Sequence, residues 1–197
     1  MTDAKILSVV NNPAILALSQ DPLATSALRV QRDVNVPKDK YGVGETHVWS
    51  GRLAHGDQVV ILLNMANEKQ IISVSLEEIF VRDGAGGTAP QNYHDWDVYD
   101  LWAGRMSDKD AQSILDTTDQ TTREQLFKQL NWYNSTEIPY SEGLRKRDPR
   151  LMGKKVSSIP AQGILEADVL RHAARVFRLH NVDDSNTKRR VAIKDEL

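Results

Sequence analysis

Three aspartates lie close together in the sequence and are the first candidates for chemistry. Asp95, Asp97 and Asp100 fall in a stretch that alternates polar and apolar residues, which predicts a β-strand. On a strand, Asp95 and Asp97 would share one face and Asp100 would take the other. Carboxylates in this arrangement can bind calcium or the hydroxyl groups of a sugar. A solvated strand face is the simpler interpretation, so we expect no metal site here.

Two short motifs concern covalent modification and cellular location rather than catalysis. Asn134, Ser135 and Thr136 form an N-glycosylation acceptor for a chain that enters the secretory lumen. The last four residues match a signal that a receptor reads to return proteins to the endoplasmic reticulum; they are Lys194, Asp195, Glu196 and Leu197. No signal peptide is visible at the start of the sequence. We therefore expect glycan and retrieval only in a longer parent protein that carries one.

The remaining reactive residue types do not form a recognisable site. The chain has no cysteine, no Gly-x-Ser-x-Gly motif, and five histidines without metal-motif spacing, at positions 47, 55, 94, 172 and 180. Four tryptophans could stack on sugar rings: Trp49, Trp96, Trp102 and Trp132. Trp49 and Trp96 have apolar neighbours in predicted strands, so we expect both to pack in a core. The sequence thus predicts no catalytic residue, no metal and no cofactor in this chain.

Length and charge exclude several classes of protein. A chain of 197 residues suits one domain with attachments. A net charge of -2 does not favour nucleic acid as a partner, because nucleic-acid-binding proteins usually carry a basic stripe. No apolar run approaches the roughly 20 residues that a membrane-spanning helix needs.

The hydrophobic pattern changes its period along the chain. Asn12 and Pro13 predict the N-cap and first position of a helix, which ends before Pro22. From Leu28 to about Trp102 the pattern favours strands, with a capping-box turn beginning at Ser75. Ser107 and Thr121 then look like N-caps of helices in a polar insertion, and strand signals return from Lys155. Many short strands with turn signals predict a mainly β fold, an antiparallel two-sheet β-sandwich.

Five segments in this order resemble the end of the melibiase or α-galactosidase family of clan-D glycoside hydrolases. They are Asn12 to Leu23, Trp49 to Leu53, Gly56 to Val60, Val98 to Ala103 and His172 to Leu179. The segment from Trp132 to Thr136 and the long insertion resemble the secreted fungal-type subgroup. The resemblance implies a Greek-key β-sandwich packed on a (β/α)8 barrel, and retaining hydrolysis of terminal α-galactosides by the complete enzyme.

The resemblance also implies a division of the chain. Residues 1–25 would be the last barrel helix and its exit, and 26–104 the first part of the β-sandwich. Residues 105–151 would be a helical insertion, 152–180 the last sandwich strands, and 181–197 a flexible tail. The family's nucleophile and acid/base aspartates lie on barrel strands that have no counterpart here. Arg29 and Asp33 show the Arg-x-x-x-Asp spacing of the acid/base motif, but they fall in a sandwich strand, so we take this spacing as chance.

We therefore expect the C-terminal portion of an α-galactosidase-like hydrolase that is inactive alone. Its partners would be the missing catalytic barrel and, in the complete enzyme, a galactoside substrate, with homo-oligomers left open. The parent would be secreted, or held in the lumen of the endoplasmic reticulum. Two alternatives remain: α-N-acetylgalactosaminidase specificity, and a non-catalytic sugar-binding or interaction sandwich with exposed tryptophans.

Overall fold

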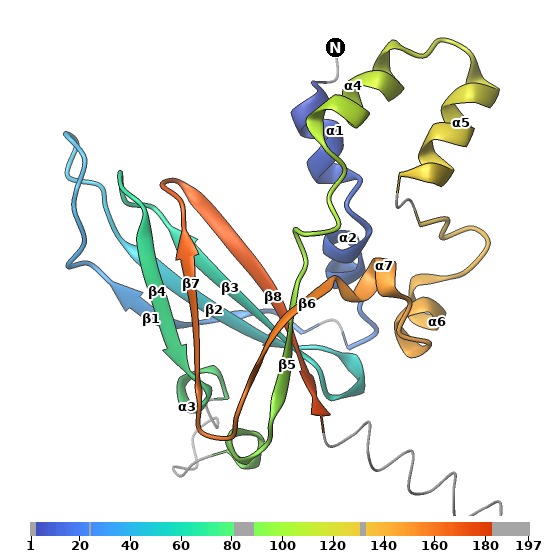
Figure 1. The fold of residues 1–197 in the computed structure, drawn as a ribbon. Coiled ribbons are helices and arrows are strands. Elements are labelled where there is room, and N and C mark those ends of the chain that lie inside the picture. Colours follow the sequence, from blue (N-terminus) through green and yellow to red (C-terminus); the bar gives the residue numbers. More distant parts are fainter. Residues whose placement is uncertain (1–2, 24, 81–88, 131–132, 183–197) are drawn as a thin grey trace, which may run out of the picture. The chain divides into compact units, whose positions relative to one another are not determined.

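The computed structural model describes residues 3–23, 25–80, 89–130 and 133–182, and these form two compact units (Figure 1). Unit 1 comprises residues 1–24 and 100–154, and unit 2 comprises residues 25–99 and 155–197. Among the described residues, unit 1 is built mainly of helices and unit 2 mainly of strands. The expectation of a mainly β chain was therefore too narrow, because the chain as a whole is mixed α/β.

Within the described residues, eight strands form two sheets. The strands are β1 Leu28–Asp33, β2 Thr46–Arg52, β3 Gln58–Asn64, β4 Gln70–Ser75, β5 Trp96–Asp100, β6 Lys154–Ile159, β7 Ile164–Val169 and β8 Ala173–Asn181. One sheet has six strands in the order β1-β2-β3-β8-β5-β6, and the other pairs β4 with β7. The pairings β1–β2, β2–β3, β3–β8 and β4–β7 are antiparallel. The predicted strand regions are confirmed.

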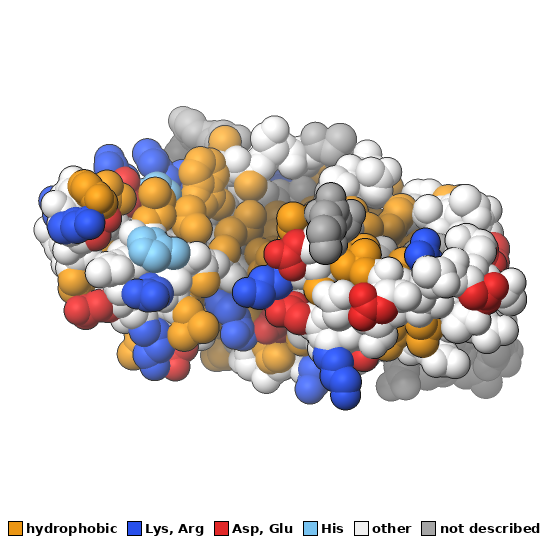
Figure 2. All heavy atoms as spheres, turned by 90° about the horizontal axis from the view of Figure 1, so that it is seen from above, with side chains coloured by type: hydrophobic (Ala, Val, Ile, Leu, Met, Phe, Trp, Pro, Cys, Tyr) orange, Lys and Arg blue, Asp and Glu red, His pale blue; other side chains and the backbone are white. Residues whose placement is uncertain are grey.

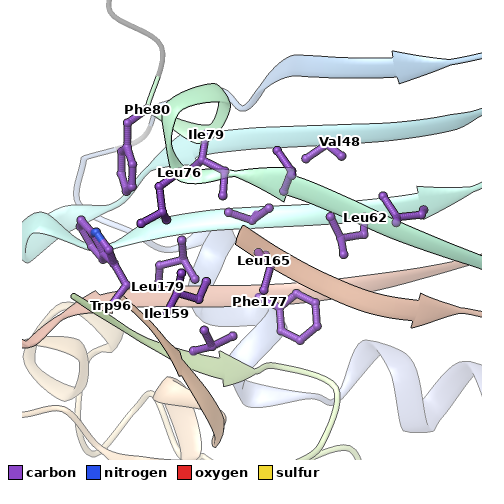
Figure 3. Close-up of a cluster of buried hydrophobic side chains, with 14 of the residues drawn as sticks. Val48, Leu62, Leu76, Ile79, Phe80, Trp96, Ile159, Leu165, Phe177 and Leu179 are labelled. Carbon is purple, nitrogen blue, oxygen red and sulfur yellow. The ribbon is translucent and has the colours of Figure 1, made fainter. Parts of the chain in front are cut away.

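The core of unit 2 lies between these two sheets (Figure 3). Val60 and Leu62 of β3 and Phe177 and Leu179 of β8 alternate with residues of the opposite face, as a period of two requires. The two-stranded sheet contributes residues such as Leu165. Trp96 is also buried here, where its ring stacks on Phe80 with centroids 4.7 Å apart. The expectation that Trp96 packs in a core is confirmed.

Polar side chains lie at the ends of this core, and Asn64 is fully buried. The Nδ2 group of Asn64, at the end of β3, donates hydrogen bonds to the backbone carbonyls of Glu68, Val169 and Leu170 at 2.8–3.1 Å. The side chain thus joins the large sheet to β7 of the small one. Ser75 begins the short helix α3 (Leu76–Ile79) with a complete capping box to Glu78. The predicted capping box is therefore confirmed.

The second face of the large sheet is also apolar over its central strands. Trp49 of β2 lies opposite Ile61 of β3, and Ile61 lies opposite Val176 of β8. Leu63 continues this row on β3. Trp49, Ile61 and Leu63 are half-buried, and Val176 is buried. We call Trp49, Ile61, Leu63 and Val176 the outer apolar face.

A buried ionic cluster adjoins the outer apolar face. Asp57, just before β3, accepts a hydrogen bond from Nη1 of Arg178 at 3.0 Å, and its other oxygen lies 2.6 Å from Nδ1 of His180. The side chains of Asp57, Arg178 and His180 are only 5%, 2% and 6% exposed. Because Arg178 and His180 alternate with Leu179 on β8, they point away from the core between the sheets.

Unit 1 contains six helices among the described residues. They are α1 Ala4–Val10, α2 Pro13–Ser19, α4 Asp108–Asp116, α5 Gln120–Gln129, α6 Tyr140–Arg145 and α7 Pro149–Met152. Ala4 and Leu7 of α1 pack with Ala111 and Ile114 of α4, and Ala17 of α2 packs with residues of α6 and α7. No helix of the described residues is both long and apolar enough to span a membrane.

Of the three N-caps predicted for these helices, two are confirmed. Asn12 caps α2 as predicted, and its Nδ2 group also donates to the carbonyl of Leu101 at 2.9 Å. Ser107 caps α4. The prediction of Thr121 as an N-cap was wrong, because Asp119 accepts from the backbone N–H of Thr122 and α5 starts at Gln120. An aspartate two residues upstream supplies a stronger cap than a threonine.

Removal of the Asp57 carboxylate should destabilise unit 2 strongly. Asp57→Ala leaves the Arg178 guanidinium buried without its partner, so we expect a loss of about 3–5 kcal/mol in the free energy of unfolding. Asp168→Ala is the matched control, because its ion pair with Lys69 is 61% and 55% exposed and should contribute little. Urea denaturation followed by tryptophan fluorescence measures both. Equal midpoints for the two variants would contradict a stabilising role of the cluster.

Candidate functional site

Asp95, just before β5, and Asp97 of β5 lie at an open groove of about 420 Å³ in unit 2. Asp97 accepts hydrogen bonds from Ser158 at 2.6 Å and forms an ion pair with Lys155 at 2.7 Å. Asp95 accepts from the backbone N–H of Ala161 at 2.9 Å. Both carboxylates therefore have partners within the protein.

The pKa of Asp97 agrees with a carboxylate that is held by partners within the protein. Partial burial raises the pKa of the Asp97 carboxyl, but the hydrogen bonds and charges of its neighbours outweigh burial and lower the pKa overall. Asp100 lies on the other face, is buried, and accepts from the backbone N–H of Trp102 at 2.8 Å. The predicted division of faces is confirmed. No group of three or more potential metal ligands gathers anywhere in the described part of the chain.

Arg29 and Asp33 are not brought together. Both lie on β1, where Arg29 is opposite Trp49 and Asp33 is opposite Thr46. The guanidinium of Arg29 lies 5.9 Å from the centroid of the Trp49 ring, whereas Asp33 accepts from the backbone N–H of Asn35 at 2.8 Å. Residues at the two ends of a six-residue strand cannot act on one substrate atom.

The tryptophans divide into different environments. Trp96 is buried and its Nε1 donates to the carbonyl of Gln91 at 3.0 Å, so its ring is not available to a ligand. Trp49 is only half-buried, which corrects the expectation that it packs in the core. Trp102 is half-buried as well. Trp132 lies outside the described residues, as do Lys194 to Leu197 and most of the glycine-rich loop that precedes Pro90.

Two of the histidines lie beside carboxylates. The contact between His180 and Asp57 was not predicted from the sequence. Nε2 of His47 lies 3.0 Å from Glu45, whose carboxylate also pairs with Arg32. These hydrogen bonds lower the pKa of Glu45 to about 2. The contact of His180 with Asp57 was missed because the two residues are 123 positions apart in the chain. The residues next to His180 and Asp57 in the sequence do not indicate that these two side chains pair.

The N-glycosylation acceptor occupies a turn in unit 1. Oδ1 of Asn134 accepts hydrogen bonds from the backbone N–H of Thr136 at 3.1 Å and from its hydroxyl at 2.6 Å. Nδ2 of Asn134 donates to Oε1 of Glu137 at 2.8 Å. Ser135, Thr136 and Glu137 are exposed, and Asn134 is half-buried. The acceptor therefore lies at the surface of the unit, where a glycan has room.

Two adjoining hollows, which we call the Tyr140 groove, lie beside this turn. They have volumes of about 240 and 600 Å³, and Leu16, Ser135 and Tyr140 line both. The Tyr140 ring packs on Tyr133, with centroids 5.0 Å apart. Hydroxyl and amide side chains surround this apolar centre, and they belong to Gln20, Asn134, Ser135, Thr136 and Ser141.

Charged side chains show no concentration of one sign on the visible surface. On the face that Figure 2 shows, basic and acidic side chains are interspersed rather than gathered into one patch. Ion pairs between opposite charges include those of Lys155 with Asp97 and of Lys146 with Glu142. An interspersed surface of this kind gives no electrostatic footprint for a polyanion.

Comparison with known proteins identifies the chain's relatives. Residues 43–123 match the family model described as the alpha galactosidase C-terminal beta sandwich domain. The chain is 38% identical over 172 residues to an α-galactosidase of Saccharomyces mikatae, and 39% identical over 173 residues to one of Lachancea cidri. The solved structure of an α-galactosidase from Saccharomyces cerevisiae is similar with a TM-score of 0.80 and 35% identity.

These matches cover most of this chain but only a minor part of each relative. The alignments cover 87% and 88% of this chain but only 35% of each relative, and the structural match covers 91% of this chain and 38% of the solved one. The chain thus spans about a third of the length of the relatives that it matches. By sequence and by fold, the chain corresponds to the C-terminal β-sandwich domain of the α-galactosidase family together with the region around it.

Proposed function

We propose that this chain is the C-terminal portion of an α-galactosidase-like glycoside hydrolase, and that the complete enzyme removes terminal α-galactosyl residues with retention of configuration. The observation that carries the proposal is the match at 38% identity over nearly the whole chain to about a third of an α-galactosidase. The chain's role in that enzyme is structural: it supports the part that performs catalysis.

The outer apolar face supports this role. A sheet that faces water on one side normally alternates apolar and polar residues, whereas Trp49, Ile61 and Leu63 extend an apolar row across neighbouring strands. Contiguous apolar surface of this kind marks an interaction site. The proposed occupant is the catalytic barrel, since the relatives contain about twice as much additional chain as this one supplies.

Unit 1 supports the same assignment from its helices. Ile6, Val9 and Val10 of α1 are exposed and lie at spacings of three and four residues, which places them on one helical face. The helix α2 would be the last helix of the barrel, as the resemblance implies. In unit 2, β8 lies between β3 and β5 while β4 and β7 pair in the second sheet, which supports Greek-key connectivity.

The catalytic groups would come from outside this chain. A retaining glycosidase needs two carboxyl groups roughly 5–5.5 Å apart, one as nucleophile and one as acid/base. The candidate carboxylates of unit 2 are engaged instead: Asp95 and Asp97 hold neighbouring segments, and Asp57 holds Arg178 and His180. The sugar specificity, galactose or N-acetylgalactosamine, would also be set by the missing part.

The half-buried Trp49 favours one further candidate function, a sugar-binding sandwich without catalysis. Aromatic rings that remain accessible can stack on sugar rings. Since Trp96 is buried, the tryptophans of the described residues on which this candidate can rest are Trp49 and Trp102, both half-buried. Binding of a galactoside by the isolated chain that is lost in Trp49→Ala, without loss of folding, would favour it.

The isolated chain should not hydrolyse aryl α-galactosides, and a fusion should restore hydrolysis. In the fusion, the N-terminal two-thirds of the Saccharomyces mikatae relative precedes this chain. Ile61→Glu should abolish the activity of the fusion by placing a charge in the contact with the barrel, whereas Ile71→Glu, at a position 66% exposed, should retain it. Turnover by the isolated chain that one carboxylate substitution in it removes would contradict the proposal.

The complete protein is proposed to pass through the secretory pathway. The Asn134 acceptor lies at an exposed turn, and the C-terminal tetrapeptide Lys194 to Leu197 would return the protein to the endoplasmic reticulum. Deletion of Lys194 to Leu197 from the chain fused to a signal peptide should raise the secreted fraction, as measured by immunoblotting of medium and cells. Replacement of the tetrapeptide by four alanines is the length-matched control and should act like the deletion. An unchanged secreted fraction would show that no receptor reads this terminus.

A further inference from the structure

The Tyr140 groove has the chemistry of a site for a neutral sugar. Among the described residues, no charged side chain lines either hollow, although 26% of the chain is charged. The centre is apolar, from Leu16 and Tyr140, and the rim offers the Gln20 amide and the hydroxyls of Ser135 and Ser141. A pyranose has the same division, with apolar C–H faces and a rim of hydroxyl groups.

The glycosylation acceptor lies in the wall of this groove. Asn134 and Thr136 line the smaller hollow, and Ser135 lines both. A sugar joined to Asn134 therefore starts at the groove and needs no free diffusion to reach it. The larger hollow, with a volume of about 600 Å³, is of the size that pockets for small ligands have.

We propose that the first N-acetylglucosamine of an Asn134-linked glycan lies in the Tyr140 groove and stabilises unit 1 by joining α2 to the segment from Tyr133 to Ser141. This inference rests on the proposed secretory route. The transfer forms a bond between Nδ2 of Asn134 and C1 of the sugar, breaks the bond from C1 to the diphosphate of a lipid-linked oligosaccharide donor, and releases one amide proton. One N–H remains on Nδ2 after transfer.

The local hydrogen bonds would orient the attached sugar. Oδ1 of Asn134 is held by the N–H and hydroxyl of Thr136, which fixes the plane of the amide. Nδ2 now donates to the exposed Glu137, and the remaining N–H can keep that bond. A fixed amide plane restricts the directions in which the first sugar can leave the turn. The Tyr140 ring, packed on Tyr133, provides a fixed surface for the sugar to contact.

The test compares three forms of one preparation of the chain, secreted through a signal peptide from a host that makes high-mannose glycans. The forms are intact, trimmed by endoglycosidase H to a single N-acetylglucosamine, and freed of glycan by peptide:N-glycosidase F. Peptide mass spectrometry verifies the state of Asn134. We expect equal melting temperatures for the first two forms and a melting temperature about 2–4 °C lower for the third. N134D controls for the aspartate that complete removal creates.

Variants at the groove locate the effect. Tyr140→Ala should cancel the difference between the trimmed and glycan-free forms, whereas Tyr93→Ala, at an exposed position of unit 2, should preserve it. In a separate measurement, free N-acetylglucosamine is added to the N134Q variant. Stabilisation of N134Q that depends on Tyr140 and matches that of the attached sugar would overturn the proposal in favour of a site for free sugars.

The outcomes separate this inference from the secretory proposal. A chain that enters the lumen but carries no sugar on Asn134 overturns the inference, because no sugar is then attached at the groove. A glycosylated chain whose trimmed and glycan-free forms melt at the same temperature overturns the inference while the secretory route stands.

Discussion

The apolar character of the large sheet on both faces is the constraint on which the other features depend. One face packs on the β4–β7 sheet and forms the core of unit 2. The other face presents Trp49, Ile61 and Leu63, which are half-buried. A chain that had to be stable alone would place polar residues at such positions, because each exposed apolar side chain forgoes its transfer free energy. The sheet therefore has the composition of an inner layer, which agrees with a chain spanning a third of its relatives.

The ionic cluster follows from the same constraint. Arg178 and His180 are buried on the outer side of β8, so the Arg178 guanidinium needs a partner of opposite charge where it lies. Asp57 provides this, and its position just before β3 places it beside β8 because β3 and β8 pair. Buried ion pairs add little stability relative to apolar replacements, but loss of one partner costs much. The cluster is thus better explained as a constraint on how β3 and β8 align than as a catalytic group.

The sequence predicted the local structure well where the determinants are local. Asn12 followed by Pro13 fixed the start of α2, and the capping box at Ser75 fixed α3, because caps are formed by residues two or three positions apart. Alternating apolar residues predicted the strands for the same reason. The helix α1 was not separated from α2, since Asp3 as its N-cap gives only a weak signal near a terminus.

Contacts between distant segments could not be predicted in this way. The bond from Asn12 to Leu101 spans 89 positions, and that from Arg178 to Asp57 spans 121. Each depends on which strands pair and which helices pack, and alternation alone specifies neither. Asp97 and Asp100 of β5, with Asp95 just before it, were assigned to the correct faces because strand geometry is local. The groove beside Asn134 was missed, because Leu16 and Tyr140 meet only when α2 and α6 have packed in unit 1.

The accessibility of a thiol on the outer apolar face tests directly whether the catalytic barrel covers this face. The chain has no cysteine, so Ile61→Cys introduces a single thiol on this face and Ile71→Cys introduces one at an exposed position of β4. Alkylation rates at each site are measured by peptide mass spectrometry, in the isolated chain and in the fusion with the N-terminal two-thirds of the Saccharomyces mikatae relative. We expect the fusion to slow alkylation at position 61 at least tenfold and to leave the rate at position 71 unchanged. Equal rates at position 61 in the two proteins would contradict the claim that this face is built to be covered by the catalytic barrel.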